Sequence, residues 1–311
     1  MTSASGDLAE AVGGVLREAY PDAKLFGIDA KELGPASVIC DVVEFGPYAY
    51  EAQYCEFLTD YCARNSIDFV IPCLDQEIIE ISKCPDLRER LNIIMPRSDL
   101  VSVFADKLKT AQWLTERNLP APDTWLLSEA PPSALPLVVK PRRGSGSANV
   151  QVVRSTRMLD ATAEEFGDDY VAQRYIGTDE TEFTCPLITF DGEVRQLILR
   201  RALLMGRTVR ATVEENRAIA EMLDSLAKAA MPEGPLNVQL RLDKDDKPWI
   251  FEINARFSST VKMRHALGFS DLQWIIDAKL GKRIPQYAAP YGYRVMRMSR
   301  EIVLPDMKAK S

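Results

Sequence analysis

Four polar side chains have types and spacing that suit a site for a metal ion and a phosphate. They are Gln239, Glu252, Asn254 and Arg256. Amide and carboxylate oxygens are hard ligands of the kind that Mg²⁺ binds, one carboxylate can bridge two ions, and a guanidinium pairs with an anion. The four side chains can therefore form a metal–phosphate site if the fold brings them to one face.

A predicted β-hairpin brings them together. The segments on either side of the charged residues 244–247 alternate apolar and polar side chains, which is the period of a half-buried strand. A hairpin centred on Asp245 and Asp246 places Gln239 opposite Glu252. The alternative is a polar outer face on an antiparallel sheet, and the spacing alone leaves both interpretations open.

These two segments resemble the metal-binding core of the ATP-grasp family. They resemble in particular the ATP-grasp halves of the large subunit of carbamoyl-phosphate synthase and their single-copy relatives. The resemblance implies that Gln239 holds one Mg²⁺, Glu252 bridges two and Asn254 holds the other. It also implies that Arg256 contacts the transferred phosphoryl group or the acyl phosphate.

A lysine and a loop rich in glycine and serine form a second candidate group. Lys140 follows the apolar residues 137–139, and residues 141–149 include two arginines, two glycines and two serines. Glycines let backbone N–H groups approach phosphate oxygens, while lysine adds a compact positive charge. The lysine precedes the glycines, so this is not a P-loop. Taken without context, an exposed hairpin with a solvated lysine is the alternative.

The resemblance assigns these residues to the nucleotide phosphates. Lys107 and Lys140 match the two basic positions that reach the phosphates, although the carbamoyl-phosphate synthase pattern has arginine at both. Lysine therefore leans toward other ligases of the superfamily. Without the resemblance, Lys107 is an exposed helix lysine. The loop that closes over the phosphates consists of Gly144, Ser145, Gly146 and Ser147.

The resemblance also implies how adenosine is held. The backbone of Tyr175 and Ile176 would hydrogen-bond the adenine edge. Glu182 matches the acid that holds the ribose hydroxyls, whereas counting from the linker between the subdomains favours Glu180; the motif favours Glu182. The linker residues that line the adenine site are Gln173, Arg174, Tyr175 and Ile176.

Two further groups are candidates for the acceptor substrate. Clustered guanidinium groups can bind a substrate carboxylate bidentately, and a charged β-strand surface is the alternative. A predicted helix begins after Arg256, and a helix N-terminus attracts anions, so Ser258 and Ser259 are placed beside the acyl phosphate. His265 is interpreted as structural rather than as a base. The remaining candidates are Arg200, Arg201, Arg207, Arg210, Lys262 and Arg264.

The first 100 residues alternate helix-like and strand-like segments, which predicts a small parallel α/β sheet. Asp29 ends a strand, but residues 2–6 lack the glycine pattern of a dinucleotide site. The resemblance identifies this part as the small domain that precedes ATP-grasp modules. Asp75 and Glu77 follow another strand, and either contact substrate or cap the next helix; capping is favoured.

The rest of the chain predicts antiparallel sheets joined by helices. A helix is expected over residues 102–118, and a capping box at residues 212–215 is expected to open another. The predicted fold class is α/β (α+β), with a pre-ATP-grasp domain and a two-subdomain ATP-grasp module. The expected boundaries are 1–100, 101–172 and 173–311.

Composition limits the classes of function. The formal net charge of −7 does not favour a nucleic-acid-binding surface, because nucleic acid is also negatively charged. No apolar stretch reaches the length of a membrane helix. The six cysteines contain no Cys-x-x-Cys pair and are predicted to be reduced thiols of a cytoplasmic protein. With a single histidine, His265, a His-ligated zinc site or a Ser/His/Asp triad is nearly excluded.

The predicted function is an ATP-dependent carboxylate–amine or carboxylate–thiol ligase that acts through an acyl phosphate. The expected cofactors are ATP and two Mg²⁺, with Mn²⁺ as an alternative ion. The expected partners are a small-molecule carboxylate and an amine, with a homodimer left open. The alternatives are a kinase on the same fold and a nucleotide-binding subunit without turnover.

Overall fold

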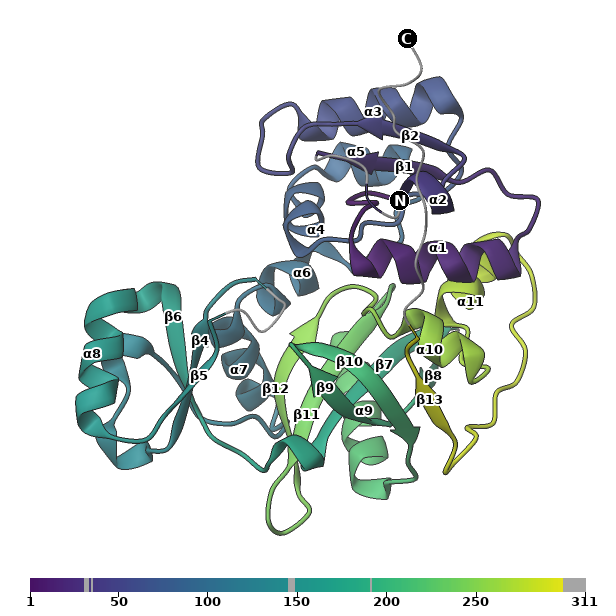
Figure 1. Ribbon diagram of the computed structural model, residues 1–311. Helices are drawn as coiled ribbons and strands as arrows, with labels where there is room; N and C mark the ends of the chain where they lie inside the picture. The colour runs from purple at the N-terminus through teal and green to yellow at the C-terminus, as the bar shows by residue number, and fades with distance from the viewer. Residues whose placement is uncertain (31–33, 35, 145–148, 191, 299–311) are drawn as a thin grey trace.

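The computed structural model describes residues 1–298 except 31–33, 35, 145–148 and 191, and it has three parts (Figure 1). Helices around a small parallel sheet form the N-terminal part, at the top of the view. A four-stranded antiparallel sheet lies at the left, and a larger antiparallel sheet lies below. This arrangement confirms the predicted α/β fold class, with a parallel sheet first and antiparallel sheets after it.

The N-terminal part packs helices around two parallel strands, β1 (Phe26–Asp29) and β2 (Val42–Phe45). Two further segments, expected from the sequence to be strands at residues 69–72 and 93–95, meet only in a parallel bridge between Val70 and Ile93. Prolines follow both residues closely and cannot donate to a ladder. The helices are α1 (Asp7–Ala19), α2 (Ala36–Ile39), α3 (Tyr54–Asn65), α4 (Asp75–Ser82), α5 (Pro85–Arg90) and α6 (Ser98–Phe104).

The helix predicted over residues 102–118 is divided in two. Asp106 has an extended backbone and caps the second helix, because its carboxylate accepts hydrogen bonds from the backbone N–H groups of Leu108 and Lys109. The second helix is α7 (Lys107–Glu116). Lys107 therefore stands in the first turn of a helix rather than in the middle of one.

The four-stranded sheet has the order β3-β6-β4-β5, and α8 covers one face (Figure 1). Leu137, Val139 and Val153 are fully buried beneath that helix, together with Leu159. The elements are β3 (Thr124–Leu126), η1 (Leu127–Glu129), η2 (Pro132–Ala134), β4 (Leu137–Pro141), β5 (Gln151–Val153), α8 (Thr156–Phe166), η3 (Gly167–Asp169) and β6 (Tyr170–Arg174).

The larger sheet has the order β12-β11-β7-β9-β10-β13, with β8 paired to β7. Its elements are η4 (Asp179–Thr181), β7 (Glu182–Phe190), β8 (Glu193–Gln196), β9 (Leu199–Leu204), β10 (Arg207–Val213), α9 (Arg217–Ala230), β11 (Leu236–Leu242), β12 (Pro248–Asn254), α10 (Val261–Ala266), α11 (Asp271–Lys279) and β13 (Arg294–Met296). The predicted capping box at residues 212–215 is wrong, because Asn216 caps α9 instead.

The predicted hairpin register is confirmed where it matters for the site. β11 and β12 are antiparallel, and Gln239 pairs with Glu252. A bulge beside this pair then shifts the register by one residue toward the turn, so Leu240 pairs with Ile250 and Phe251 is the extra residue. The hairpin is therefore not symmetric about Asp245 and Asp246.

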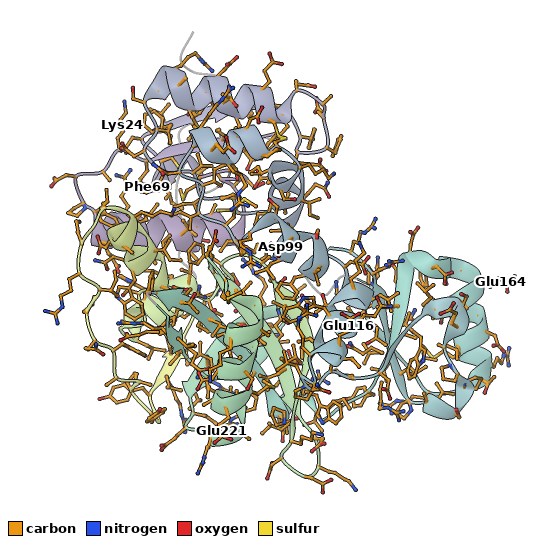
Figure 2. The ribbon with its side chains drawn as sticks, turned by 180° about the vertical axis from the view of Figure 1, so that it is seen from behind. Lys24, Phe69, Asp99, Glu116, Glu164 and Glu221 are labelled. Atoms are coloured by element: carbon orange, nitrogen blue, oxygen red, sulfur yellow. A yellow bond between two sulfur atoms is a disulfide. The ribbon has the colours of Figure 1, made fainter. Side chains whose placement is uncertain are left out.

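Figure 2 shows the opposite side of the molecule, where charged side chains such as Glu116, Glu164 and Glu221 lie on the outer faces of helices and are exposed. Beneath such faces, Leu223 and Leu226 of the amphipathic α9 are fully buried. Among the described residues, no helix is both long and apolar enough to span a membrane.

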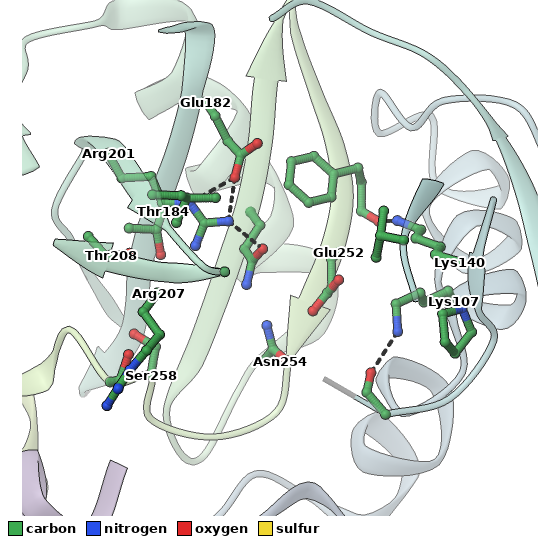
Figure 3. A pocket seen from close by; sticks show the side chains of 18 of the residues that line it. Lys107, Lys140, Glu182, Thr184, Arg201, Arg207, Thr208, Glu252, Asn254 and Ser258 are labelled. Atoms are coloured by element: carbon green, nitrogen blue, oxygen red, sulfur yellow. Dashed lines mark hydrogen bonds and ion pairs between the residues drawn. The ribbon is translucent and has the colours of Figure 1, made fainter. Parts of the chain in front are cut away.

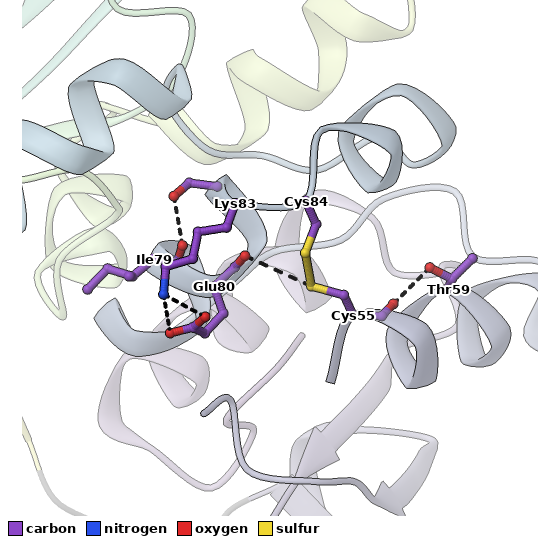
Figure 4. Close-up of a disulfide and its surroundings, with 7 residues drawn as sticks. Cys55, Thr59, Ile79, Glu80, Lys83 and Cys84 are labelled. Atoms are coloured by element: carbon purple, nitrogen blue, oxygen red, sulfur yellow. Dashed lines mark hydrogen bonds and ion pairs between the residues drawn. A yellow bond between two sulfur atoms is a disulfide. The ribbon is translucent and has the colours of Figure 1, made fainter. Parts of the chain in front are cut away.

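The prediction that all six cysteines are reduced is wrong for one pair. Cys55 and Cys84 form a disulfide that joins the first turn of α3 to the residue preceding α5 (Figure 4). The two residues are 29 positions apart, so no short motif marks them in the sequence. The other four are buried free thiols: Cys40, Cys62, Cys73 and Cys185.

Candidate functional site

A cavity of about 790 Å³ opens where the three parts of the molecule meet. The N-terminal part contributes Asp7 and Leu74, the four-stranded sheet contributes Lys140, and the larger sheet contributes Glu252 and Arg256. The side chains that carry charge therefore reach one cavity from segments far apart in the sequence.

The predicted metal ligands lie on the cavity wall formed by β11 and β12. Figure 3 shows Glu252 and Asn254 between the two lysines on one side and the pair of Arg201 and Glu182 on the other. In the part of the chain that the structure describes, no side chain donates a hydrogen bond to Glu252 or forms an ion pair with it. An unpartnered carboxylate beside an amide fits a hard cation.

Gln239 is placed beside these two residues, but its oxygen is engaged. Oε1 of Gln239 accepts a hydrogen bond of 2.8 Å from Nη2 of Arg201. The described residues contain no group of three His, Cys, Asp or Glu side chains that could hold a metal ion. With one carboxylate in the set, the residues fit a cation that arrives with phosphate ligands, and the second lone pair of the Gln239 oxygen is open to it.

Lys140 is buried at the boundary between the two sheets. Its Nζ donates to Oε1 of Gln173 at 2.8 Å and to the backbone oxygen of Phe251 at 3.2 Å. The β-bulge makes this second contact, because Phe251 is the extra residue and its carbonyl leaves the ladder. Burial lowers the pKa of Lys140 from 10.5 to about 8, although Glu252 nearby acts in the opposite direction.

Lys107 is also buried, and it lines the same cavity. Its Nζ donates to the backbone oxygen of Gly144 at 2.7 Å. The Asp106 carboxylate accepts from Nε of Arg142 at 2.8 Å, which ties the start of α7 to the start of the glycine-serine loop. The arginine and backbone donors lower the pKa of Asp106 despite its burial, so its charge persists at neutral pH.

Gly144 has a φ of +95°, a conformation that glycine adopts without strain, and it lines the cavity. The predicted loop residues Ser145, Gly146 and Ser147 lie outside the described residues.

The predicted adenine linker lines the cavity, but its hydrogen-bonding groups are partly used. The backbone N–H of Tyr175 donates to the carbonyl of Pro136 at 3.2 Å, and Nε2 of Gln173 donates to Oγ1 of Thr124 at 2.9 Å. The side chain of Gln173 therefore positions Lys140 and β3 rather than the adenine. The four linker residues on the cavity wall are Gln173, Arg174, Tyr175 and Ile176.

Of the two ribose candidates, Glu182 is buried on the cavity wall and Glu180 is exposed outside it. Glu182 accepts hydrogen bonds from Nε of Arg201 at 2.9 Å and from Nε of Arg241 at 2.8 Å. Sequence reasoning missed Arg241. Its position two residues after Gln239 on the same alternating strand is the signal that places it on the same face.

The arginine cluster divides into two sets. Arg201 and Arg207 line the cavity, whereas Arg200 and Arg210 are exposed and do not. Adjacent residues of a strand point to opposite faces, so Arg200 and Arg201 cannot share the site. Arg200 pairs with Glu214 on the outer face. The structure therefore does not support Arg210 as a substrate ligand.

The serine segment reaches the cavity, but the helix after it does not. Ser258 and Ser259 line the cavity, and α10 begins only at Val261. Lys262 points to α1, where its Nζ donates to the carbonyl of Gly14 at 3.2 Å. The structure therefore places Lys262 outside the predicted substrate site.

Two more residues after the serine segment are structural. Arg264 forms a fully buried ion pair with Asp271, and its Nη1 donates to Oγ of Ser258 at 3.0 Å. His265 lies 3.5 Å from Glu18 on α1, and burial lowers its pKa. Neither residue lines the cavity.

Arg256 is paired with Asp75 of the N-terminal part. Its Nε and Nη2 donate to the two carboxylate oxygens of Asp75, at 2.6 and 2.9 Å, which is a bidentate geometry. Burial alone would lower the pKa of Arg256, but Asp75 raises it overall. Glu77 is a cap, as favoured from the sequence, because its Oε2 accepts from the backbone N–H of Leu74.

Comparisons with known proteins place this geometry in a family. The profile of the ATP-grasp domain matches residues 104–260, which is half of the chain, and the profile described as the PylC-like N-terminal domain matches residues 4–95. No curated protein sequence gives a significant match.

Solved structures share the fold at low sequence identity. An L-amino acid ligase from Bacillus licheniformis is 20% identical, with a TM-score of 0.69 over 87% of this chain and 72% of its own. The ADP complex of N5-carboxyaminoimidazole ribonucleotide synthetase is 16% identical, with a TM-score of 0.74 over 92% and 77%. Biotin carboxylase from Campylobacter jejuni is 16% identical, with a TM-score of 0.67 over 92% and 71%. The resemblance predicted from the sequence is confirmed, and the chain belongs to the ATP-grasp family.

Proposed function

We propose that the protein is an ATP-dependent ligase that activates a carboxylate as an acyl phosphate and transfers the acyl group to an amine or a thiol. One observation carries the proposal. Glu252, which has no partner among the described residues, and the amide of Asn254 lie in one cavity with two buried lysines and with Arg256. Such a set suits a magnesium nucleotide whose terminal phosphate faces the acceptor end of the cavity.

The basic, acidic and amide side chains of the cavity have separate roles in the proposed nucleotide site. Lys107 and Lys140 neutralise phosphate oxygens, and burial strengthens their interaction with a charged group. Glu252, Asn254 and Gln239 would hold two Mg²⁺, which neutralise the charge on the transferred phosphoryl group when bound. Glu182 would accept hydrogen bonds from the ribose hydroxyls with its charge balanced by Arg201 and Arg241.

The chemistry needs no nucleophile from the protein. A carboxylate oxygen of the substrate forms a bond to the γ-phosphorus, and the bond between that phosphorus and the bridging oxygen of ADP breaks. The amine nitrogen then attacks the acyl carbon, phosphate leaves and the nitrogen loses a proton. Arg256 stabilises the charge in both steps. Cys73 also lines the cavity, but burial raises the pKa of its thiol to about 12, so it is a poor nucleophile.

ADP release in a coupled assay tests the proposal. Carboxylic acids are supplied with and without amines, and hydroxylamine is added as a trap, because it converts an acyl phosphate to a hydroxamate. A ligase gives a hydroxamate that depends on both ATP and the carboxylic acid. ADP release with a phosphorylated product that hydroxylamine does not trap would instead identify a kinase.

Two variants make this test specific. Glu252→Gln removes the charge at the proposed metal site, and the expected loss of hydroxamate formation is at least about a hundredfold. Glu164→Gln makes the same change on the exposed face of α8 and should have no effect. Binding of MgATP that is equal in both variants and the wild type would contradict the placement of the metal.

A further inference from the structure

One acid on the cavity wall has no role in the proposed nucleotide chemistry. Among the described residues, four acids line the cavity: Asp7, Asp179, Glu182 and Glu252. Asp179 and Glu182 are both ion-paired with Arg241, and Glu252 lies in the proposed metal group. Asp7 is different, because it comes from the first turn of α1, at the acceptor end of the cavity.

Asp7 forms an ion pair across the junction between two parts of the molecule. Its partner is Arg207 of β10, and both side chains keep about half of their surface exposed, 44% and 50%. Arg256 and Ser258 line the same cavity, and Figure 3 draws Ser258 next to Arg207. The Asp75 carboxylate is engaged by the guanidinium of Arg256, to which it is bound through both oxygens. The carboxylate that remains more exposed here is that of Asp7.

The charges around Asp7 limit the ligand that fits. A substrate with only a carboxylate can pair with an arginine, but it meets like-charge repulsion at Asp7. A substrate that also carries an ammonium group avoids this repulsion, because the ammonium group can take the place of the Arg207 guanidinium beside Asp7. Arg297 and Glu10 are further charges near this pair, since burial and Arg207 lower the pKa of Arg297 whereas Asp7 and Glu10 raise it.

We propose that the substrate activated in this cavity is a zwitterion of the amino acid type. Its ammonium group binds Asp7, and its carboxylate points to Arg256 and Ser258, where the acyl phosphate would form. Leu8, Leu74 and Leu203 line the cavity and provide an apolar wall for the substrate side chain. This assignment rests on the proposed function, because it takes the acceptor end of the cavity from it.

Binding calorimetry tests the assignment. The protein is saturated with the magnesium complex of a non-hydrolysable ATP analogue and titrated with a panel of the common L- and D-amino acids. Each amino acid is matched to its 2-hydroxy acid, which lacks the ammonium group, and to its amide, which lacks the carboxylate. At least one amino acid should bind about tenfold tighter than both of its matched analogues.

Two variants assign the ammonium site to Asp7. Asp7→Asn should weaken binding of that amino acid about fivefold to tenfold, whereas it should not weaken binding of the 2-hydroxy acid, because it removes a like charge. Glu10→Gln is the matched control, because Glu10 is the other acid in the first turn of α1 and does not line the cavity. It removes the same charge and should change neither affinity.

The outcomes separate the two proposals. If the nucleotide analogue does not bind, the proposed function fails. If it binds but no amino acid does, the zwitterion assignment is overturned while the nucleotide site stands. The assignment is also overturned if the 2-hydroxy acid binds as tightly as the amino acid, or if Asp7→Asn and Glu10→Gln give equal affinities.

Discussion

Affinity for MgATP should depend on pH through Lys140. This lysine is buried, its pKa is lowered from 10.5 to about 8 by desolvation, and the residue lines the cavity. A pKa near 8 means that the charged form decreases from about 0.9 of the protein at pH 7 to about 0.1 at pH 9. If only the charged form binds phosphate well, the Kd of MgATP rises about tenfold over this range.

Binding of MgATP should restore the proton to the Lys140 side chain. Phosphate oxygens beside Nζ favour the charged lysine, so they raise its pKa in the complex. At pH 8, where about half of the free protein carries the proton, binding should take up about half a proton per molecule. Calorimetry in two buffers that differ in ionisation enthalpy measures this uptake directly.

A matched pair of variants isolates the lysine. Lys140→Arg keeps a charge that does not titrate below pH 12, so the Kd of this variant should stay flat between pH 7 and pH 9. Lys109→Arg makes the same change on the exposed side of α7 and should retain the wild-type dependence. The reasoning is refuted if the wild-type Kd changes by less than about twofold, or if Lys140→Arg shows the same rise.

Three further predictions concern stability. Because the pKa of Lys140 is lower in the folded state, the cost of burying its charge is fully present below pH 8 and decreases as the pH rises from about 8 to 10.5. Lys140→Met should therefore raise the free energy of unfolding at pH 7 by about 1 to 3 kcal/mol in urea titrations, while it abolishes MgATP binding. A destabilised variant would contradict this prediction. Asp271→Asn leaves the charge of Arg264 buried without its partner and should lower the free energy of unfolding by about 3 to 5 kcal/mol; a loss below about 1 kcal/mol would show that the pair is not buried. Cys55→Ser removes a cross-link across 29 residues and should lower the free energy of unfolding by about 3 to 4 kcal/mol under oxidising conditions; an equal value for wild type and variant would show that the disulfide does not form.

Local sequence patterns predicted the parts of the site that lie on one element. The alternation of polar and apolar residues predicted the pairing of Gln239 with Glu252, because a period of two determines which side chains share a face. The same rule explains why Arg200 and Arg201 separate. The bulge at Phe251 was not predicted, although the alternation changes phase there: Ile250 and Ile253 are buried, and Phe251 and Glu252 between them are half-buried.

Contacts between distant segments were beyond the sequence pattern. The hydrogen bond between Arg256 and Asp75 joins residues 181 positions apart, and the one between Lys262 and Gly14 joins residues 248 positions apart. Periodicity shows which face of a helix is polar, but not which element that face meets. For the same reason, Lys262 was assigned to a substrate and Asp75 to a cap, although the structure gives both a partner in another part of the molecule.

A crystal structure with Mn²⁺ and a non-hydrolysable ATP analogue, with anomalous scattering measured at the manganese edge, tests the central claim most directly. Anomalous peaks should lie within about 2.5 Å of the side-chain oxygens of Glu252 and Asn254, with the phosphates beside Lys107 and Lys140. A nucleotide bound elsewhere, or manganese peaks away from these oxygens, would contradict the account.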